Sequence, residues 1–125
     1  MVAEMKKVRS DTKRYNDYAQ AVIEKFPRSF YASEAALASA RASFDAGDLA
    51  TAQARLEWAV RSGREEHRGI ARVRLAAVLL DQKKYAEALE ILDANKDEAF
   101  SAMVADLKGD VLFAQGRIDE ARAAY

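Results

Sequence analysis

A turn-and-helix signature recurs three times in this 125-residue chain. In each copy a turn residue is followed two positions later by a large apolar residue and five positions later by alanine. The copies are Gly47-Asp48-Leu49 with Ala52, Lys83-Lys84-Tyr85 with Ala88, and Gly116-Arg117-Ile118 with Ala121. The turn residues are 36 and 33 positions apart (83 − 47 and 116 − 83), which brackets the period of about 34 residues in tetratricopeptide repeats.

Small residues accompany the signature where the two helices of a pair have to approach closely. One lies seven positions before each turn residue and another five positions after it: Ala40 and Ala52, Ala76 and Ala88, Gly109 and Ala121. Leu56, Leu92 and Tyr125 follow four positions later, where a large side chain packs against the next repeat. Ser39, Ser43 and Lys83 depart from the repeat pattern. We therefore predict an all-α fold, a tetratricopeptide-like right-handed solenoid of antiparallel helix pairs with one leading helix.

Apolar spacing and turn residues predict where the helices begin and end. A leading helix over about residues 4–26 ends at Pro27 and carries apolar residues at steps of three and four, namely Tyr15, Tyr18, Ala19, Val22, Ile23 and Phe26. Helix pairs follow over about residues 29–62, 66–94 and 97–125, with Ser29 as the first N-cap. We expect a single domain over residues 1–125. The last pair looks truncated, since its second helix needs about two more turns after Tyr125.

Composition excludes several classes of partner. Twenty basic and twenty acidic residues give a formal net charge of zero, which removes the long-range field that nucleic-acid binding depends on. We therefore expect no nucleic acid partner. The chain has no cysteine, so disulfides and thiolate metal sites are excluded. Its apolar runs all fall short of the roughly 18 residues that a membrane span requires.

Catalytic and cofactor chemistry have little support in the residue pattern. The single histidine, His67, lies in a strongly polar helix start with no serine partner at a telling spacing, and we expect it on the surface. Asp93 to Asp97 resembles the start of a calcium loop, but Glu98 and Val104 stand where glycine and a bidentate glutamate are required. That segment is better read as a helix end and a new N-cap. We expect no enzyme activity, no metal and no cofactor.

A more specific resemblance involves five stretches of the chain. They are Lys25-Phe26-Pro27-Arg28-Ser29-Phe30-Tyr31-Ala32, Gly47-Asp48-Leu49, Arg55-Leu56-Glu57-Trp58-Ala59-Val60, Ile70-Ala71-Arg72-Val73-Arg74-Leu75-Ala76 and Gly109-Asp110-Val111-Leu112. In these stretches the chain resembles the YfgM-like family, the ancillary subunits of the bacterial Sec translocon. The resemblance extends from about Tyr15 onward.

The resemblance implies a non-enzymatic role. Family members have a short cytoplasmic N-terminus, a single membrane helix and a periplasmic tetratricopeptide-like domain, which implies a full-length protein of the bacterial inner membrane with this domain in the periplasm. The implied partners are proteins: translocon subunits, periplasmic chaperones and exported chains. This part of the protein would make no membrane contact of its own. The alternative is a general tetratricopeptide scaffold or adaptor in another envelope or cytoplasmic complex.

Repeat geometry predicts the surface that a partner would use. In a tetratricopeptide array the first helix of each pair lines the concave face, which predicts a groove lined by Leu37, Arg41, Phe44, Ile70, Val73, Leu80, Met103, Asp106, Asp110 and Phe113. Phe44, Leu80 and Phe113 lie three residues before each turn residue. They form a ladder that holds an apolar segment, or the packing between first helices, or a mixture that is part packed and part exposed. We expect the charged members to be solvated.

Two further expectations concern other surfaces. Trp58, on the second helix of the first pair, is either an anchor for a partner or a cover for the seam with the neighbouring helix. The incomplete third pair leaves an apolar face uncovered, so we expect the chain to self-associate through its C-terminal end.

Overall fold

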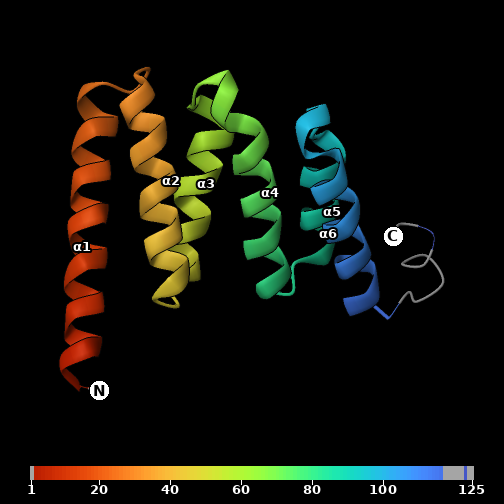
Figure 1. The fold of residues 1–125 in the computed structure, drawn as a ribbon, viewed down its shortest axis with the longest axis horizontal. Helices are drawn as coiled ribbons and strands as arrows, with labels where there is room; N and C mark the ends of the chain where they lie inside the picture. The colour runs from red at the N-terminus through yellow and green to blue at the C-terminus, as the bar shows by residue number, and fades with distance from the viewer. Residues whose placement is uncertain (1, 117–122, 124–125) are drawn as a thin grey trace. The chain divides into compact units, whose positions relative to one another are not determined.

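In the computed structural model every regular element of the described residues is a helix (Figure 1). The structure describes the backbone of residues 2–116 and 123 and the side chains of residues 11–116 and 123. The helices are α1 (Val2–Lys25), α2 (Phe30–Asp45), α3 (Leu49–Ser62), α4 (Glu65–Asp81), α5 (Tyr85–Ala94), the 3-10 turn η1 (Glu98–Phe100) and α6 (Ser101–Ala114). The predicted second helix of the third pair lies outside the described residues.

The chain divides into two compact units, Met1–Arg68 and Gly69–Tyr125. In the first unit α2 packs against both α1 and α3. In the second unit α6 packs against α5 and η1. Helices that follow one another in the sequence run in opposite directions within each unit (Figure 1). This sequential pairing confirms the predicted all-α, tetratricopeptide-like fold class, while the single domain over residues 1–125 stays a prediction.

All three residues of the signature's turn position adopt a left-handed backbone. The φ angles are 82° at Gly47, 62° at Lys83 and 79° at Gly116. After α2 the Asp48 N–H donates to the Ser43 carbonyl over 2.8 Å, and after α4 the Lys84 N–H donates to the Leu79 carbonyl over 2.8 Å. This bond from the sixth residue to the first closes a Schellman motif. Lys83 therefore makes the turn that the repeat pattern assigns to glycine.

The small residues of the signature lie at closely packed positions. Ala52, Ala76 and Ala88 are fully buried and Ala40 nearly so, which lets neighbouring backbones approach. Gly109 is also buried. Leu56 and Leu92 are among the largest fully buried side chains. The predicted close-contact positions are therefore confirmed in the first two pairs, while Ala121 and Tyr125 lie outside the described residues.

The two serines that depart from the repeat pattern form a polar seam with α1. Ser39 and Ser43 are fully buried on α2. The Ser39 hydroxyl donates to Asn16 Oδ1, and the Ser43 hydroxyl donates to the same oxygen over 3.3 Å. A buried hydroxyl needs such a partner, because leaving it unpaired costs about 1–3 kcal/mol. The seam therefore fixes which face of the leading helix meets α2.

Arg55 extends the polar seam from α3. Its guanidinium donates to Gln20 Oε1 over 3.0 Å and to the Asn16 carbonyl over 3.2 Å. Partial burial lowers the pKa of Arg55, because removal from water disfavours the charged form. Both acceptors lie on α1, so the seam ties the leading helix to both helices of the first pair.

Replacing Lys83 by glycine is expected to stabilise the protein. Glycine adopts a positive φ without the steric cost that an L side chain pays, and part of that gain is offset by the larger entropy of the unfolded chain. We expect Lys83→Gly to raise the free energy of unfolding by roughly 0.5–1 kcal/mol in urea denaturation. Lys83→Ala is the matched control, because it keeps the Cβ atom and should gain nothing.

Removing Asn16 is expected to destabilise the protein through its two serine partners. Asn16→Ala leaves the Ser39 and Ser43 hydroxyls without their acceptor and should lower the free energy of unfolding by about 1–3 kcal/mol. The triple variant Asn16→Ala, Ser39→Ala, Ser43→Ala removes the donors as well and should recover part of that loss. A triple variant less stable than Asn16→Ala alone would contradict this account of the seam.

Candidate functional site

The ten residues predicted to line a groove lie on three helices. Leu37, Arg41 and Phe44 are on α2, Ile70, Val73 and Leu80 are on α4, and Met103, Asp106, Asp110 and Phe113 are on α6. The first three belong to one compact unit and the other seven to the second, so each set is described by itself. That all ten line one groove stays a prediction.

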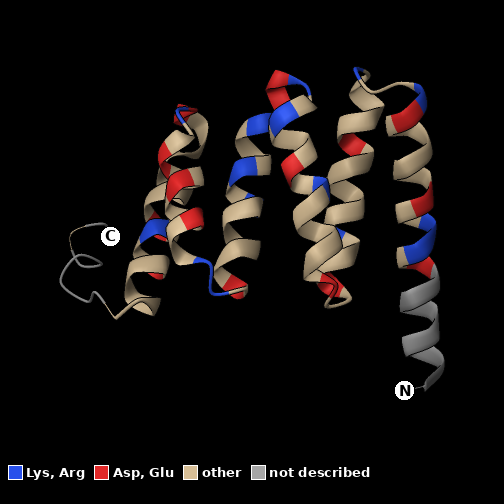
Figure 2. Cartoon of the chain, turned by 180° about the vertical axis from the view of Figure 1, so that it is seen from behind, with Lys and Arg blue, Asp and Glu red and all other residues tan. Residues whose placement is uncertain are grey.

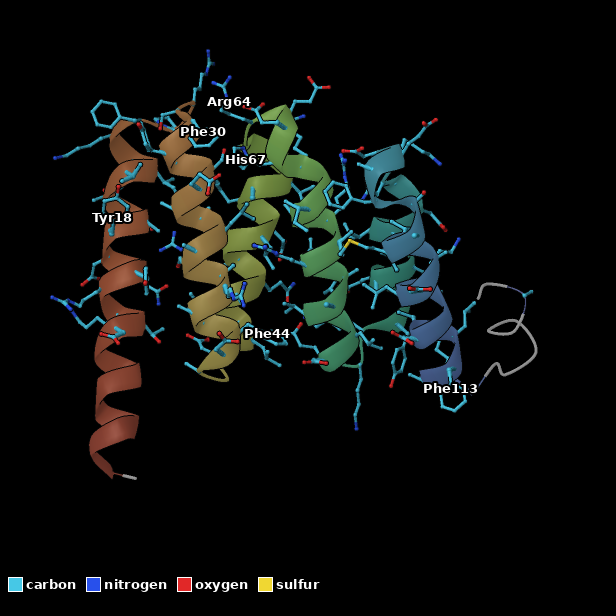
Figure 3. The ribbon with its side chains drawn as sticks, viewed as in Figure 1. Tyr18, Phe30, Phe44, Arg64, His67 and Phe113 are labelled. Atoms are coloured by element: carbon cyan, nitrogen blue, oxygen red, sulfur yellow. The ribbon has the colours of Figure 1, made fainter. Side chains whose placement is uncertain are left out.

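Burial separates the predicted lining residues into two groups. Leu37 and Val73 are buried, and Ile70 and Leu80 are half-buried, so these four contribute to packing. Phe44, Met103 and Phe113 are instead 37%, 46% and 61% exposed. Phe44 and Phe113 lie at the ends of their helices in Figure 3. Some residues of the predicted groove are therefore packed and others exposed, and both of its aromatic residues are exposed.

The exposed members on α6 form a stripe along one face of the helix. Met103, Asp106, Asp110 and Phe113 are spaced by three, four and three residues, which places them on the same side. Both carboxylates are exposed, as we expected for the charged positions. The stripe has an apolar side chain at each end, roughly 15 Å apart along the axis, with negative charge between them. On α2, Arg41 is likewise exposed.

The prediction that His67 is a surface residue was wrong, because the residue is only 6% exposed. Its ring lies 4.9 Å from the Phe30 ring in an edge contact, and its Nε2 lies 2.9 Å from Glu34 Oε1. Since a carboxylate only accepts, Nε2 carries the hydrogen. Nδ1 is buried without a hydrogen-bond partner among the described residues. The polar neighbours of His67 in the sequence concealed this contact with the start of α2.

Further hydrogen bonds hold the turn between α3 and α4 in place. The Arg64 N–H donates to Ser33 Oγ over 2.9 Å, and Arg68 Nε donates to the Gly63 carbonyl over 3.0 Å. Arg64 Nε also pairs with Glu66 at 2.7 Å, and the hydrogen bond from Arg64 lowers the pKa of that carboxyl. Arg64, His67 and Phe30 lie close together at one end of the helices (Figure 3). The turn is therefore anchored to α2.

The calcium-like segment has a structural role. Asn95 is buried and its amide donates to the Gly69 carbonyl over 3.1 Å, while the Asp97 carboxylate accepts from the Ala99 N–H over 3.0 Å. These contacts confirm a helix end followed by an N-cap. Within residues 11–116 no group of three or more histidine, aspartate or glutamate side chains is placed to hold a metal ion.

The distribution of charged and apolar residues was compared with what binding to nucleic acid and crossing a membrane require. Figure 2 shows basic and acidic residues interspersed along the helices of each unit, so the zero net charge reflects local mixing. Of the helices that the structure describes, none has both the length and the apolar character of a membrane-crossing segment.

Sequence reasoning missed a set of exposed aromatic side chains. The apolar spacing of the leading helix groups Tyr15, Tyr18 and Phe26 with Ala19, but Ala19 is fully buried whereas the three aromatic residues are more than half exposed. The width of the apolar pattern is a signal for Tyr18 alone, because residues 18 and 19 lie about 100° apart on a helix while 15 and 19 lie about 40° apart. Tyr31 at the start of α2 is also exposed.

Paired antiparallel helices, left-handed turn residues and alanines at the closest contacts define a helical-repeat protein of the tetratricopeptide class. The comparison with known sequences agrees, since the chain belongs to the tetratricopeptide repeat-like domain family, whose sequence model matches residues 2–125.

Two relatives share much of this sequence. Over 103 residues the chain is 35% identical to the ancillary SecYEG translocon subunit of Neisseria gonorrhoeae, covering 82% of this chain and 49% of that protein. Over 131 aligned positions it is 31% identical to the ancillary SecYEG translocon subunit of Escherichia coli, covering 94% of this chain and 64% of that protein. The chain is homologous to both, which confirms the resemblance to the YfgM-like family, and it spans about half to two thirds of their lengths.

Removing the carboxylate that faces His67 is expected to destabilise the start of α4. Glu34→Ala leaves the buried Nε2–H without an acceptor and should lower the free energy of unfolding by about 1–2 kcal/mol. Glu90→Ala, at an exposed position on α5, is the matched control and should change stability by less than about 0.5 kcal/mol. Thermal unfolding of both variants checks this, and equal effects would contradict a specific role for the contact.

Proposed function

We propose that this chain is a non-enzymatic protein-binding domain of an ancillary subunit of the bacterial Sec translocon. In this proposal the domain lies in the periplasm, belongs to a single-pass protein of the inner membrane, and contacts the Sec channel and periplasmic chaperones. Its similarity to two proteins named ancillary SecYEG translocon subunits supports the assignment. Because the chain spans only part of each relative, the role of the whole protein is part of the proposal.

The observation that carries the binding role is the exposure of large apolar side chains on the first helices of the pairs. Phe44 on α2 and both Met103 and Phe113 on α6 are exposed, whereas Leu37 on α2 and Val73 on α4 are buried. Exposed aromatic and methionine side chains are enriched at protein interfaces. A partner that covers them would gain apolar contact, and the charged residues on the same helices would set its orientation.

Site-specific photocrosslinking tests this proposal. A photoreactive amino acid is placed at Phe44, Leu80 or Phe113 of the full-length protein in its own membranes, and the adducts are identified by mass spectrometry. We expect adducts with Sec channel subunits or periplasmic chaperones from Phe44 and Phe113, and weaker yields from Leu80 because it is half-buried.

Matched probes on the second helices of the pairs distinguish binding at the first helices from binding elsewhere on the domain. Ala54 on α3 and Ala86 on α5 are exposed and have small side chains, so they tolerate the same probe. Translocon adducts from Ala54 and Ala86 alone would keep the translocon role and exclude the first-helix surface. Reproducible adducts with unrelated proteins alone would favour the general tetratricopeptide scaffold.

A further inference from the structure

One side of the leading helix α1 packs within the first compact unit, and an apolar stripe beside that side is largely exposed. Asn16, Ala19 and Ile23 follow helical spacing on the side that packs, where Ala19 is fully buried. Tyr15, Tyr18 and the half-buried Val22 form the exposed stripe at steps of three and four residues, and Phe26 continues this spacing directly after the end of α1. Tyr15 is 51% and Tyr18 is 58% exposed. Tyr18 lies at the outer side of α1 in Figure 3.

Charges of opposite sign lie at equal distances on either side of Tyr18. Asp11 precedes Tyr18 by seven residues and Lys25 follows it by seven, which is two helical turns or roughly 10 Å in each direction. Lys25 is exposed and has no ion-pair partner among the described residues. Asp11 Oδ1 lies 3.9 Å from the Arg14 guanidinium, and this solvent-exposed ion pair contributes little to stability.

The exposed face of α1 is complementary to the same face of a second copy of the chain. When a second copy of α1 lies antiparallel across the first and crosses it at Tyr18, the two Tyr18 rings meet and Tyr15 faces Val22 of the second copy. Each Asp11 then faces Lys25 of the second copy, twice by symmetry. A parallel arrangement would instead oppose Asp11 to Asp11 and Lys25 to Lys25. The charges therefore select the antiparallel twofold arrangement over the parallel one.

We propose that this protein forms a weak, symmetric homodimer through the Tyr15, Tyr18 and Val22 face of α1, with paired Asp11–Lys25 contacts at its two ends. The half-exposed aromatic residues of the stripe offer about 300 Å² of apolar surface per copy. That is well below the roughly 800 Å² per partner of a stable interface, so the association is reversible, with a Kd on the order of 100 µM.

Sedimentation velocity of the 125-residue chain from about 10 µM to about 1 mM tests the dimer. We expect the sedimentation coefficient to rise with concentration in the unmodified chain. Tyr18→Glu should abolish the rise because it places a charge at the twofold axis. Tyr31→Glu is the matched control, an exposed tyrosine on α2 outside the stripe, and should dimerise normally. Circular dichroism checks that both variants keep their helices.

A charge exchange tests the orientation. Asp11→Lys and Lys25→Asp should each raise Kd several-fold, since each places like charges opposite one another. The double variant exchanges the two charges and should return Kd to within about twofold of the unmodified value.

Three results would overturn the proposal. One is a monomer throughout the concentration range, and another is failure of the double charge exchange to recover dimerisation. The third is a dimer that survives Tyr18→Glu but is lost in Phe113→Glu, which would place self-association at α6 in accord with our expectation for the C-terminal end.

Discussion

The reversal of the chain between two helices depends on a single residue with a positive φ, and the rest of each pair depends on that reversal. At Gly47 and Lys83 the left-handed residue closes a Schellman motif, which ends one helix and starts the next within three residues. Two helices joined so tightly have to touch near the turn. Buried alanines on both helices, such as Ala40 on α2 and Ala52 on α3, make that approach sterically acceptable.

Apolar burial alone does not hold the first compact unit together. The leading helix meets α2 through Asn16, Ser39 and Ser43, and Arg55 reaches α1 from α3. Directional hydrogen bonds of this kind specify register, because a rotated or shifted helix would leave buried polar groups unpaired. The polar seam also explains why α1 keeps aromatic side chains on its outer flank. Its packing face is occupied by Asn16, Ala19 and Ile23, and Tyr15 and Tyr18 beside that face are exposed to solvent.

The same division between packing and exposure applies to the predicted binding residues. Leu37 and Val73 serve the interior, whereas Phe44 and Phe113, at the C-terminal ends of their helices, remain exposed. A helical repeat stabilises itself with one set of positions and presents another set to solvent, where residues vary without cost to the fold. The protein-binding role that we propose rests on family membership, on similarity to ancillary translocon subunits and on these exposed apolar side chains.

The sequence by itself determined the features that depend on short-range spacing. The turn residues, the Ser29 cap and the buried alanines all follow from residues within about ten positions of each other, where local backbone geometry governs the outcome. The repeat period is the spacing of these local signatures along the chain. Tertiary structure decided the rest. His67 is buried by Phe30 and Glu34, more than thirty positions away, and Ser39 finds its acceptor on another helix. Which side chains are shielded from solvent depends on how separate helices pack. The apolar periodicity of one helix does not specify which residues of a neighbouring helix contact it.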